Sequence, residues 1–333
     1  MEAQSGAEQM LDKYYRVEKI FYVIIAAIGV LVNLLAIVIL SRGTCGLSNC
    51  TARYLVAMAA ADLLVIVTEV ILFQISYHYF PISFLDITPV CSVIAVLRFT
   101  ATDCSVWFTV AFTFDRFVAI CCPKLKTKYC TGKTAAVVLT ATGILFFLKN
   151  VPRYFTREPR EIIDKMPFFC VLMHSYFTDP GWVGYDWSDA ILTPLLPFAV
   201  ILLLNALTVK HILVANIVRK GLLGPSKGAN QCDPELKNRT KSVILLFTIS
   251  GSFILLWLTL VLEFVYYQVT GTGAGRNVSE IIFSDVGYLL RNFSCCTNTF
   301  IYAVTQSKFR EEVRSAVKFA VISVLPFVSN SGP

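Results

Sequence analysis

The chain has 333 residues, of which 56% are apolar and 15% are charged, against about 25% charged residues in soluble domains. This composition excludes an ordinary soluble domain and favours a protein that crosses a membrane several times. The net charge of +7 is carried mainly by the connections between apolar runs, so it indicates a basic membrane face and no nucleic-acid partner.

Residues 1–19 mix acids and bases without an apolar run, so they are predicted to be an N-terminal tail and not a cleavable signal peptide. Seven later windows have the ~20 mostly apolar residues that cross the hydrocarbon of a bilayer. These windows are residues 20–40, 54–77, 91–121, 134–153, 189–217, 242–268 and 281–304. We therefore predict an all-α integral membrane protein, with a seven-transmembrane helix bundle over residues 20–305.

The connections between the windows predict the orientation of the bundle. If the N-terminus is extracellular, the inner connections hold 18 Lys and Arg residues and the outer ones hold 8. Positive charge accumulates on the cytoplasmic side, so we expect this orientation. In residues 306–333, Phe309, Val313 and Val317 recur at helical spacing between charged residues, which predicts a short amphipathic cytoplasmic helix. A frayed polar tail is the alternative.

Of the eleven cysteines, only Cys91 and Cys170 fall on the outer side of this topology. In an oxidising compartment they are the natural disulfide pair, and two free thiols are the alternative. A bridge would hold the outer loop against the bundle. Asn277, in the stretch GRNVSE, is the one sequon on an outer connection, so it is the predicted glycosylation site.

Asp62 is the clearest ionisable residue within a predicted span, where such a residue is costly and invites a functional interpretation. Small polar side chains are expected at a similar depth in neighbouring spans: Asn33, Ser105, Ser294 and Asn298. One interpretation is a hydrated cluster around Asp62 that holds an allosteric sodium ion. The other is interhelical hydrogen bonding without an ion.

A second group of charged residues lies nearer to the outer side of the predicted bundle: Glu69, Arg98, Asp103, Glu263 and Arg291. Arginine prefers carboxylate or phosphate partners. Arg98 and Arg291 are therefore either neutralised by Glu69 and Glu263 or available to an anionic group of a ligand. Asp103 and Lys149 are expected to pair between the third and fourth spans.

Several sequence features occur in order at the expected places along the spans: Cys91 with Cys170, MAAADLL around Asp62, DRF at 115–117, Trp257, and NTFIY at 298–302. Together with the seven spans they make the chain resemble the rhodopsin-like (class A) G-protein-coupled receptors over about residues 20–320. By this resemblance, Asp115 and Arg116 correspond to the start of the D-R-Y motif. Asn298 and Tyr302 correspond to the ends of N-P-x-x-Y.

The resemblance implies a plasma-membrane receptor without a catalytic step. Such a receptor binds an extracellular small-molecule or peptide ligand and shifts a two-state helix bundle that activates a heterotrimeric G protein. The residues implied to bind the ligand are Glu69, Arg98, Phe99, Thr102, Trp257, Glu263, Tyr288 and Arg291. Those implied to form the G-protein switch are Asp115, Arg116, Asn298 and Tyr302. The implied sodium site comprises Asp62, Ser105, Ser294 and Asn298, and no other cofactor is expected.

The chain also departs from the family pattern. Thr259 and Thr299 stand where proline is expected, so the kinks that these prolines make are weaker or are made by other means. Arg239 and Lys241 stand at the inner end of the sixth span, which argues against a glutamate-based lock on the motif arginine. Within the family, the chain resembles the orphan subgroup reported to sense aromatic amino acids and peptides. Arg98 stands where that subgroup places an acid, so we expect a ligand with a negative charge.

Three other membrane functions fit the sequence less well. A retinal-binding opsin needs a Schiff-base lysine in its last span, and residues 281–304 contain no Lys. A polytopic transporter, the alternative function, often shows repeated halves with Gly- or Pro-broken spans, and none is visible. A membrane enzyme would gather histidines or acids, or pair a nucleophile with a base, but the three histidines are scattered.

Overall fold

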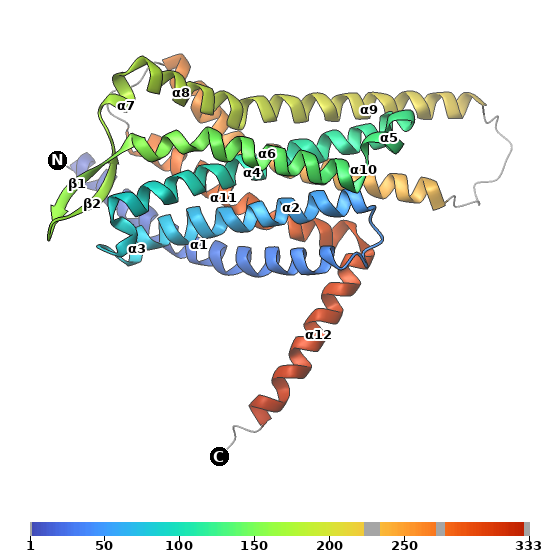
Figure 1. Ribbon diagram of the computed structural model, residues 1–333, viewed down its shortest axis with the longest axis horizontal. Helices are drawn as coiled ribbons and strands as arrows, with labels where there is room; N and C mark the ends of the chain where they lie inside the picture. Colours follow the sequence, from blue (N-terminus) through green and yellow to red (C-terminus); the bar gives the residue numbers. More distant parts are fainter. Residues whose placement is uncertain (1, 223–233, 271–276, 330–333) are drawn as a thin grey trace.

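The computed structural model describes residues 2–222, 234–270 and 277–329, which form a bundle of long helices along one axis (Figure 1). The N-terminus lies at the end of the bundle that carries a β-hairpin, which we call the hairpin end. Helix α5 (Pro123–Tyr129) lies at the opposite end, which we call the α5 end. Strong helical structure over apolar sequence is expected in a bilayer, because every backbone polar group must be paired within the protein.

Long helices with polar caps build the described part of the bundle. Their bounds are α1 (Glu2–Ser41), α2 (Asn49–Val65), α4 (Thr88–Cys121), α6 (Gly132–Asn150), α9 (Leu196–Leu222), α10 (Pro234–Thr270) and α11 (Val278–Thr305). Ser48, Thr131 and Asn277 cap α2, α6 and α11 by accepting a backbone N–H. These caps explain where three of the helices begin.

Shorter elements extend three of these helices at the hairpin end. Helix α2 continues through the π-helix η1 (Ile66–Ile75) into α3 (Ser76–Tyr79), and the 3₁₀-helix η3 (Val151–Thr156) continues α6. Helix α8 (Pro180–Ala190) and the π-helix η4 (Ile191–Leu195) precede α9. The short helices η2 (Phe84–Asp86) and α7 (Ser175–Thr178) lie in the connections.

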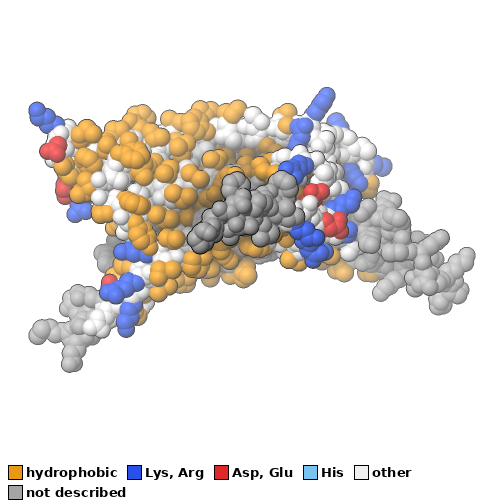
Figure 2. Space-filling model, turned by 90° about the horizontal axis from the view of Figure 1, so that it is seen from below, with side chains coloured by type: hydrophobic (Ala, Val, Ile, Leu, Met, Phe, Trp, Pro, Cys, Tyr) orange, Lys and Arg blue, Asp and Glu red, His pale blue; other side chains and the backbone are white. Residues whose placement is uncertain are grey.

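Among the described residues, six helical segments are long and apolar enough to cross a membrane. They are Gln9–Ser41, Asn49–Tyr79, Thr88–Cys121, Gly132–Thr156, Pro180–Ala215 and Thr240–Tyr266. Figure 2 shows hydrophobic side chains over the middle of one face, with Lys and Arg near its ends. Helix α11 packs against α1 and α10, but its many Asn, Ser and Thr residues together with its charged residues make it less apolar than these six segments. Six of the predicted spans are therefore confirmed, and the seventh stays a prediction.

The first span is longer than its apolar window, because α1 begins at Glu2 and not near residue 20. Residues 2–19 therefore continue the helix at the hairpin end instead of forming an irregular tail. An apolar window marks only the part of a helix that is suited to the hydrocarbon of the bilayer. The helix itself continues beyond the window where the flanking residues favour helical structure. Whether residues 1–19 are extracellular stays a prediction.

A two-stranded antiparallel hairpin stands at the hairpin end, formed by β1 (Arg157–Ile163) and β2 (Met166–Leu172). Asp164 and Lys165 join the strands with φ of 50° and 65°, as a type I′ turn requires. The all-α prediction is wrong for this segment, because the charged residues of β1 hide any apolar alternation. The predicted disulfide is confirmed: Cys91 in α4 is bonded to Cys170 in β2, with 6.3 Å between their Cα atoms.

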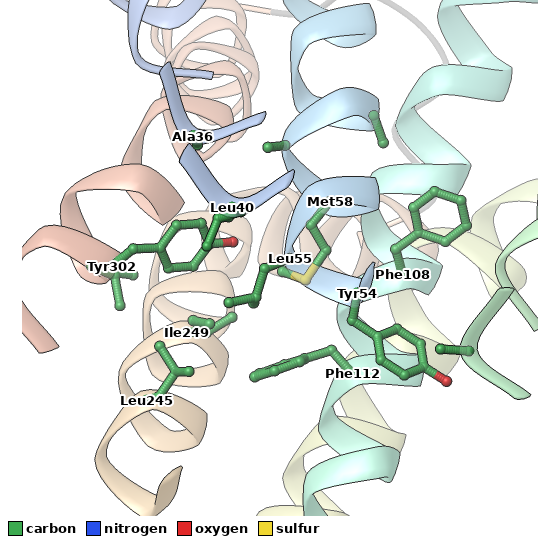
Figure 3. Packing of buried hydrophobic residues seen from close by; sticks show 14 of the residues in the cluster. Ala36, Leu40, Tyr54, Leu55, Met58, Phe108, Phe112, Leu245, Ile249 and Tyr302 are labelled. Atoms are coloured by element: carbon green, nitrogen blue, oxygen red, sulfur yellow. The ribbon is translucent and has the colours of Figure 1, made fainter. Parts of the chain in front are cut away.

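The main core lies in the α5-end half of the bundle, where α1, α2, α4, α10 and α11 meet (Figure 3). Leu55, Met58 and Phe112 are fully buried there, as are Leu245 and Tyr302. Helices α1, η1 and α11 come close together at Gly29. A Cβ at Gly29 would lie 2.9 Å from Ile66 Cδ1 and 3.1 Å from Cys296 Sγ, so glycine lets α1, η1 and α11 approach one another.

Helix α12 (Ser307–Ser329) follows α11 at the α5 end and points away from the bundle (Figure 1). Phe309 is fully buried and packs edge-on against Tyr302, with 5.9 Å between the ring centroids. Val313 packs against the same core, whereas Val317 is exposed. The helix predicted after the last span is therefore present, and its near end is fixed to the bundle by an aromatic contact.

Candidate functional site

One buried carboxylate contacts two arginines at the hairpin end. Glu69 Oε2 lies 3.0 Å from Arg98 Nε, and Glu69 Oε1 lies 3.1 Å from Arg291 Nη2. The three residues come from η1, α4 and α11, and their side chains are 6%, 12% and 12% exposed. The contact at Arg98 Nε is an ion pair without hydrogen-bond geometry, and Arg291 Nε makes no hydrogen bond among the described residues. Removing such a shared acid would leave two buried charges without a partner.

Glu69 lies in a π-helix. Such segments are rare and frequent at functional sites. Glu69 lies in η1 and is 4% exposed, and the preceding α2 carries the buried Asp62 seven residues earlier. The continuous helix from α2 into η1 therefore carries two buried acids about two turns apart.

Aromatic rings cover the guanidinium groups near Glu69. The Cζ atom of Arg98 lies 3.9 Å from the centroid of the Phe73 ring and 5.1 Å from that of Phe99. The Cζ atom of Arg153 in η3 lies 3.4 Å from the Phe99 centroid, so this ring stands between two cations. Such contacts stabilise desolvated cations by up to about 2 kcal/mol each.

A second ionic network joins α4, α6 and the segment before α9. Lys149 Nζ lies 2.8 Å from Asp103 Oδ2 and also contacts Asp189 Oδ1. Arg153 Nη2 lies 2.6 Å from Asp189 Oδ2, and Thr193 Oγ1 donates a 2.7 Å hydrogen bond to Asp103 Oδ1. The predicted pair of Asp103 and Lys149 is present, and it belongs to a larger network that the sequence did not indicate.

The other predicted ligand-binding residues lie around these networks at different depths. Thr102 is buried and donates to the Arg98 carbonyl, and Glu263 is buried as well. Tyr288 is 41% exposed, and its ring lies 5.0 Å from Arg291 Cζ. Trp257 packs on Phe253 and donates a 3.3 Å hydrogen bond to Ser294 Oγ. The structure brings Glu69, Arg98, Phe99 and Arg291 into contact, with Trp257 one layer further inward.

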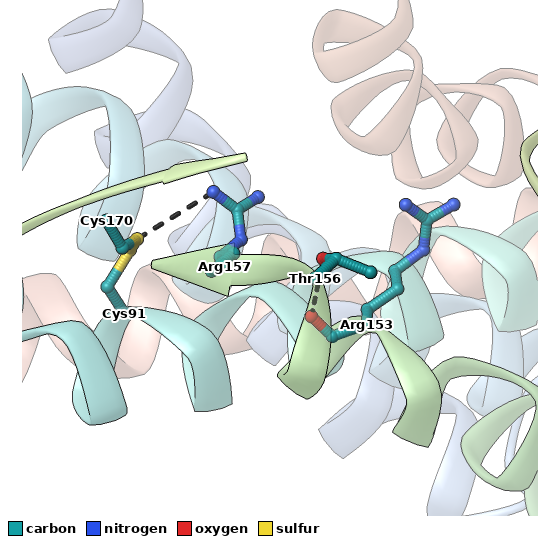
Figure 4. Close-up of a disulfide and its surroundings, with 5 residues drawn as sticks. All are labelled: Cys91, Arg153, Thr156, Arg157 and Cys170. Carbon is teal, nitrogen blue, oxygen red and sulfur yellow. Dashed lines mark hydrogen bonds between the residues drawn. A yellow bond between two sulfur atoms is a disulfide. The ribbon is translucent and has the colours of Figure 1, made fainter. Parts of the chain in front are cut away.

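Arg157 is a residue of this region that the sequence analysis missed. It begins β1, and its Nη1 donates a long 3.7 Å hydrogen bond to Cys170 Sγ (Figure 4). Burial and the positive charges of Arg98 and Arg153 lower the pKa of Arg157 to about 10. In the sequence it is one of several charges in an outer loop, so only the fold shows that it is enclosed.

Asp62 is the centre of a polar cluster midway along the bundle. Ser105 Oγ donates to Asp62 Oδ1 at 2.5 Å, and Asn298 Nδ2 donates to Asp62 Oδ2 at 2.8 Å. Ser294 donates instead to the Arg291 carbonyl at 2.6 Å. Asn33 donates to the Cys295 carbonyl at 2.9 Å, which ties α1 to α11. The predicted interhelical hydrogen bonds around Asp62 are therefore present.

At the α5 end, Arg116 is held by residues of α4 and α10, and two thiols contact its partner Asp115. Its Nε donates a 3.0 Å hydrogen bond to Asp115 Oδ2, and its Nη2 contacts the same oxygen. Its Nη1 donates to Ser242 Oγ of α10 at 3.3 Å. Cys50 of α2 donates to Asp115 Oδ1 at 3.1 Å, and Cys130 donates to the Asp115 carbonyl. Ser242 and the two thiols were not expected from the sequence.

The residues predicted as a single switch occupy three places. Asp115 and Arg116 form one pair, whereas Asn298 belongs to the Asp62 cluster. Tyr302 is fully buried in the main core, and its hydroxyl has no hydrogen-bond partner among the described residues. Lys241 lines the cavity beside Arg116, whereas the side chain of Arg239 lies outside the described residues.

A cavity of about 840 Å³ opens at the α5 end beside Arg116. Lysines from three further segments line it: Lys126, Lys241 and Lys308. Its described lining contains no Asp or Glu side chain, so the cavity offers a positively charged surface to an acidic partner.

Comparison with known proteins decides the family. The family described as "7 transmembrane receptor (rhodopsin family)" matches residues 32–302, which is most of the chain. The chain belongs to this family. It is therefore a multi-pass plasma-membrane receptor and not an enzyme, and the family implies ligand binding and G-protein coupling.

Individual relatives of this rhodopsin-family receptor are distant. It is 23% identical to the FMRFamide receptor of Drosophila melanogaster over 314 residues, 86% of this chain and 51% of that protein. It is 24% identical to C-C chemokine receptor type 1 of Macaca fascicularis over 92% of this chain and 82% of the relative. It is 26% identical to the B1 bradykinin receptor of Tupaia minor over 92% and 84%. The chain thus spans about half the length of the Drosophila relative.

Proposed function

We propose that this receptor binds an extracellular small-molecule or peptide ligand at the hairpin end and activates a heterotrimeric G protein at the α5 end. In this proposal the hairpin end and the N-terminus are extracellular, α11 is the seventh span, and α12 lies on the cytoplasmic face. The excess of Lys and Arg in the connections of the α5 end supports this orientation. A disulfide at the hairpin end supports it too, because disulfides persist in oxidising compartments.

The observation that carries the proposal is a line of contacts from the shared acid toward the Asp62 cluster. Arg291 pairs with Glu69, and its carbonyl accepts the hydroxyl of Ser294 one turn further along α11. Ser294 in turn accepts the indole N–H of Trp257, which brings in α10. A ligand that displaces Arg291 would therefore change the packing of α10 against α11.

In this proposal the G protein binds at the α5 end. In the described structure Arg116 is bonded to Asp115 and Ser242, which hold α4 and α10 together. An agonist that favours an open state of the bundle would move α10 away, and Arg116 would exchange these partners for the G protein. The cavity lined by Lys126, Lys241 and Lys308 is the proposed contact surface, and anionic lipids would lie beside it.

A sodium ion at Asp62 is part of this proposal. Asp62, Ser105, Ser294 and Asn298 carry oxygen atoms, the ligands that hard cations prefer, and two of these side chains, Ser105 and Asn298, donate hydrogen bonds to Asp62. If the ion binds, replacing sodium chloride by choline chloride lowers the thermal unfolding midpoint of the wild type but not that of Asp62→Asn. An equal response of both proteins would contradict a sodium site.

Glycosylation of Asn277, which is exposed at the start of α11, also stays a prediction.

The test of the proposed function is agonist-driven nucleotide exchange. Cells that express the chain are screened with amino acids, peptides and organic acids, using calcium and cyclic AMP as readouts. Membranes with the wild type should then accelerate nucleotide exchange on a G protein, whereas Arg116→Ala should reach the cell surface and signal poorly. Lys133→Ala, an exposed change at the start of α6, is the matched control. Normal exchange by the Arg116 variant would refute the assigned role.

A further inference from the structure

Ser242 of α10 contacts Arg116 through its hydroxyl. Its Oγ accepts a 3.3 Å hydrogen bond from Arg116 Nη1, while Asp115 is bonded to Nε and Nη2 of the same guanidinium. Ser242 is half-buried and lines the cavity of about 840 Å³ at the α5 end. Open space therefore adjoins this hydroxyl, and a larger group can be attached to it without displacing Asp115.

The cavity beside Ser242 is positively charged. Arg116 and three lysines line it: Lys126, Lys241 and Lys308. These cations come from α4, α5, α10 and α12, and the described lining contains no Asp or Glu side chain. A neutral hydroxyl does not balance their charge. An anionic group attached to Ser242 would be attracted by all four.

The sequence around Ser242 has the charge pattern of a substrate for a basophilic protein kinase. Arg239 stands three residues before it, in the stretch RTKS. Kinases of this class recognise basic side chains that precede the target hydroxyl, and charge patterns of this kind set their specificity. The other hydroxyl residues of the cavity lining have no Lys or Arg three residues before them: Ser48, Thr51 and Ser307.

In the proposed orientation a cytoplasmic kinase can reach Ser242. The apolar segment Thr240–Tyr266 has 27 residues and rises about 40 Å, whereas the hydrocarbon layer is about 30 Å thick. Ser242 is near the start of this segment, so it falls in the headgroup region. A kinase binds its substrate in an extended form, so the first turns of α10 must unwind before transfer. Movement of α10 away from α4 favours this step.

We propose that Ser242 is a phosphorylation site, and that its phosphate binds Arg116 and holds α10 against α4. This inference rests on the proposed function, in which the α5 end is cytoplasmic and Arg116 is released on activation. In the transfer, Ser242 Oγ bonds to the γ-phosphorus of ATP, and the bond from that phosphorus to the β–γ bridging oxygen breaks. ADP leaves, and the hydroxyl proton passes to the base of the kinase.

A phosphate would hold Arg116 more strongly than the hydroxyl does. It carries about two negative charges at neutral pH and offers three acceptor oxygens for charge-assisted hydrogen bonds. Arg116 Nη1 already points to the Ser242 oxygen, and the lysines of the cavity supply donors for the remaining phosphate oxygens. Because Arg116 belongs to α4 and Ser242 to α10, the stronger bond opposes separation of these helices and stabilises the inactive state.

The first test is the modification itself. Full-length receptor purified in detergent is incubated with ATP and a calmodulin-dependent protein kinase that recognises Arg three residues before its target, and peptide mass spectrometry locates the phosphate. Arg239→Gln should lower the phosphate at Ser242 by about tenfold. Lys237→Gln, which removes a nearby charge but keeps Arg239, is the control and should be modified like the wild type. Absence of phosphate at Ser242, both here and in receptor from cells treated with okadaic acid, would overturn the proposal.

The second test needs no kinase. Ser242→Glu and Ser242→Gln introduce side chains of nearly equal shape that differ by one charge. Glu should raise the thermal unfolding midpoint by about 2 °C or more over Gln, because it adds a charge-assisted bond to Arg116. In an Arg116→Gln background the difference should disappear. Equal midpoints of the two Ser242 variants would overturn the proposal, and so would a difference that persists without Arg116.

The thermal measurement is independent of G-protein coupling. If Ser242 is phosphorylated and the Glu variant is stabilised through Arg116, but the receptor never accelerates nucleotide exchange, the proposed function is contradicted and the phosphate contact stands. If the receptor couples normally but the Glu and Gln variants unfold alike, the proposed function stands and this inference is wrong.

Discussion

Arg116 at the α5 end has an acid of its own, whereas Arg98 and Arg291 at the hairpin end share one. Asp115 precedes Arg116 in the chain, and a serine and two thiols reinforce the pair. Glu69 lies on a different element from either of its arginines. The contacts of Arg116 therefore begin with a neighbour in the chain, whereas those of Arg98 and Arg291 depend on one acid that a separate element supplies.

The largest effect is expected from removing the shared acid. Glu69→Gln removes the carboxylate that the buried Arg98 and Arg291 share, which should destabilise the folded receptor by about 3–5 kcal/mol. Surface expression and the thermal unfolding midpoint would measure the loss. Glu158→Gln, an exposed change in β1, is the control and should behave like the wild type. If the Glu69→Gln receptor is as stable as this control, the two arginines do not depend on Glu69, and the difference described between the two ends is wrong.

A smaller, functional effect is expected from Asp115→Asn. The variant keeps the shape of the side chain but weakens its charge-assisted hydrogen bonds to Arg116, so the released arginine should favour the active state. Basal nucleotide exchange should rise by about tenfold, which corresponds to about 1.4 kcal/mol. Glu311→Gln, an exposed change at the same end, controls for the lost charge. A fall in basal exchange would mean that Asp115 does not restrain Arg116.

The smallest effect is expected from Ser242→Ala, which removes one hydrogen bond between α10 and Arg116. A bond of this kind contributes about 0.5–1.5 kcal/mol, so basal exchange should rise by about threefold. Thr248→Ala is matched on the same helix, because its hydroxyl donates only to the Ile244 carbonyl. If both variants behave alike, Ser242 is no restraint and the α5 end depends on Asp115 alone.

The sequence predicted local features of the two ends better than their long-range contacts. The pairs that it indicated, Asp115 with Arg116 and Cys91 with Cys170, follow from adjacency or from topology. Six spans followed from apolar runs, because the bilayer sets the length of a crossing helix. The hydrogen bonds of Asp62 were foreseen as a group, because few polar residues lie at that depth.

What the sequence could not indicate depends on the path of the chain in space. Arg157 is one of several charges in a loop until β1 places it against α4. Ser242 follows a lysine at the start of an apolar run, and nothing local marks it as a partner of Arg116. The hairpin itself was missed, because neither period-2 alternation nor a strong turn signal stands out in REPREIIDKMPFFCVL.

The π-helix η1 also affects how this chain is compared with other proteins. Each of its turns closes between residues five apart instead of four, so residues after it face a different side than in a continuous α-helix. Consider a relative in which this helix is α throughout. A gapless alignment through residues 66–75 would match Phe73 and its neighbours to positions whose side chains point in other directions in that relative.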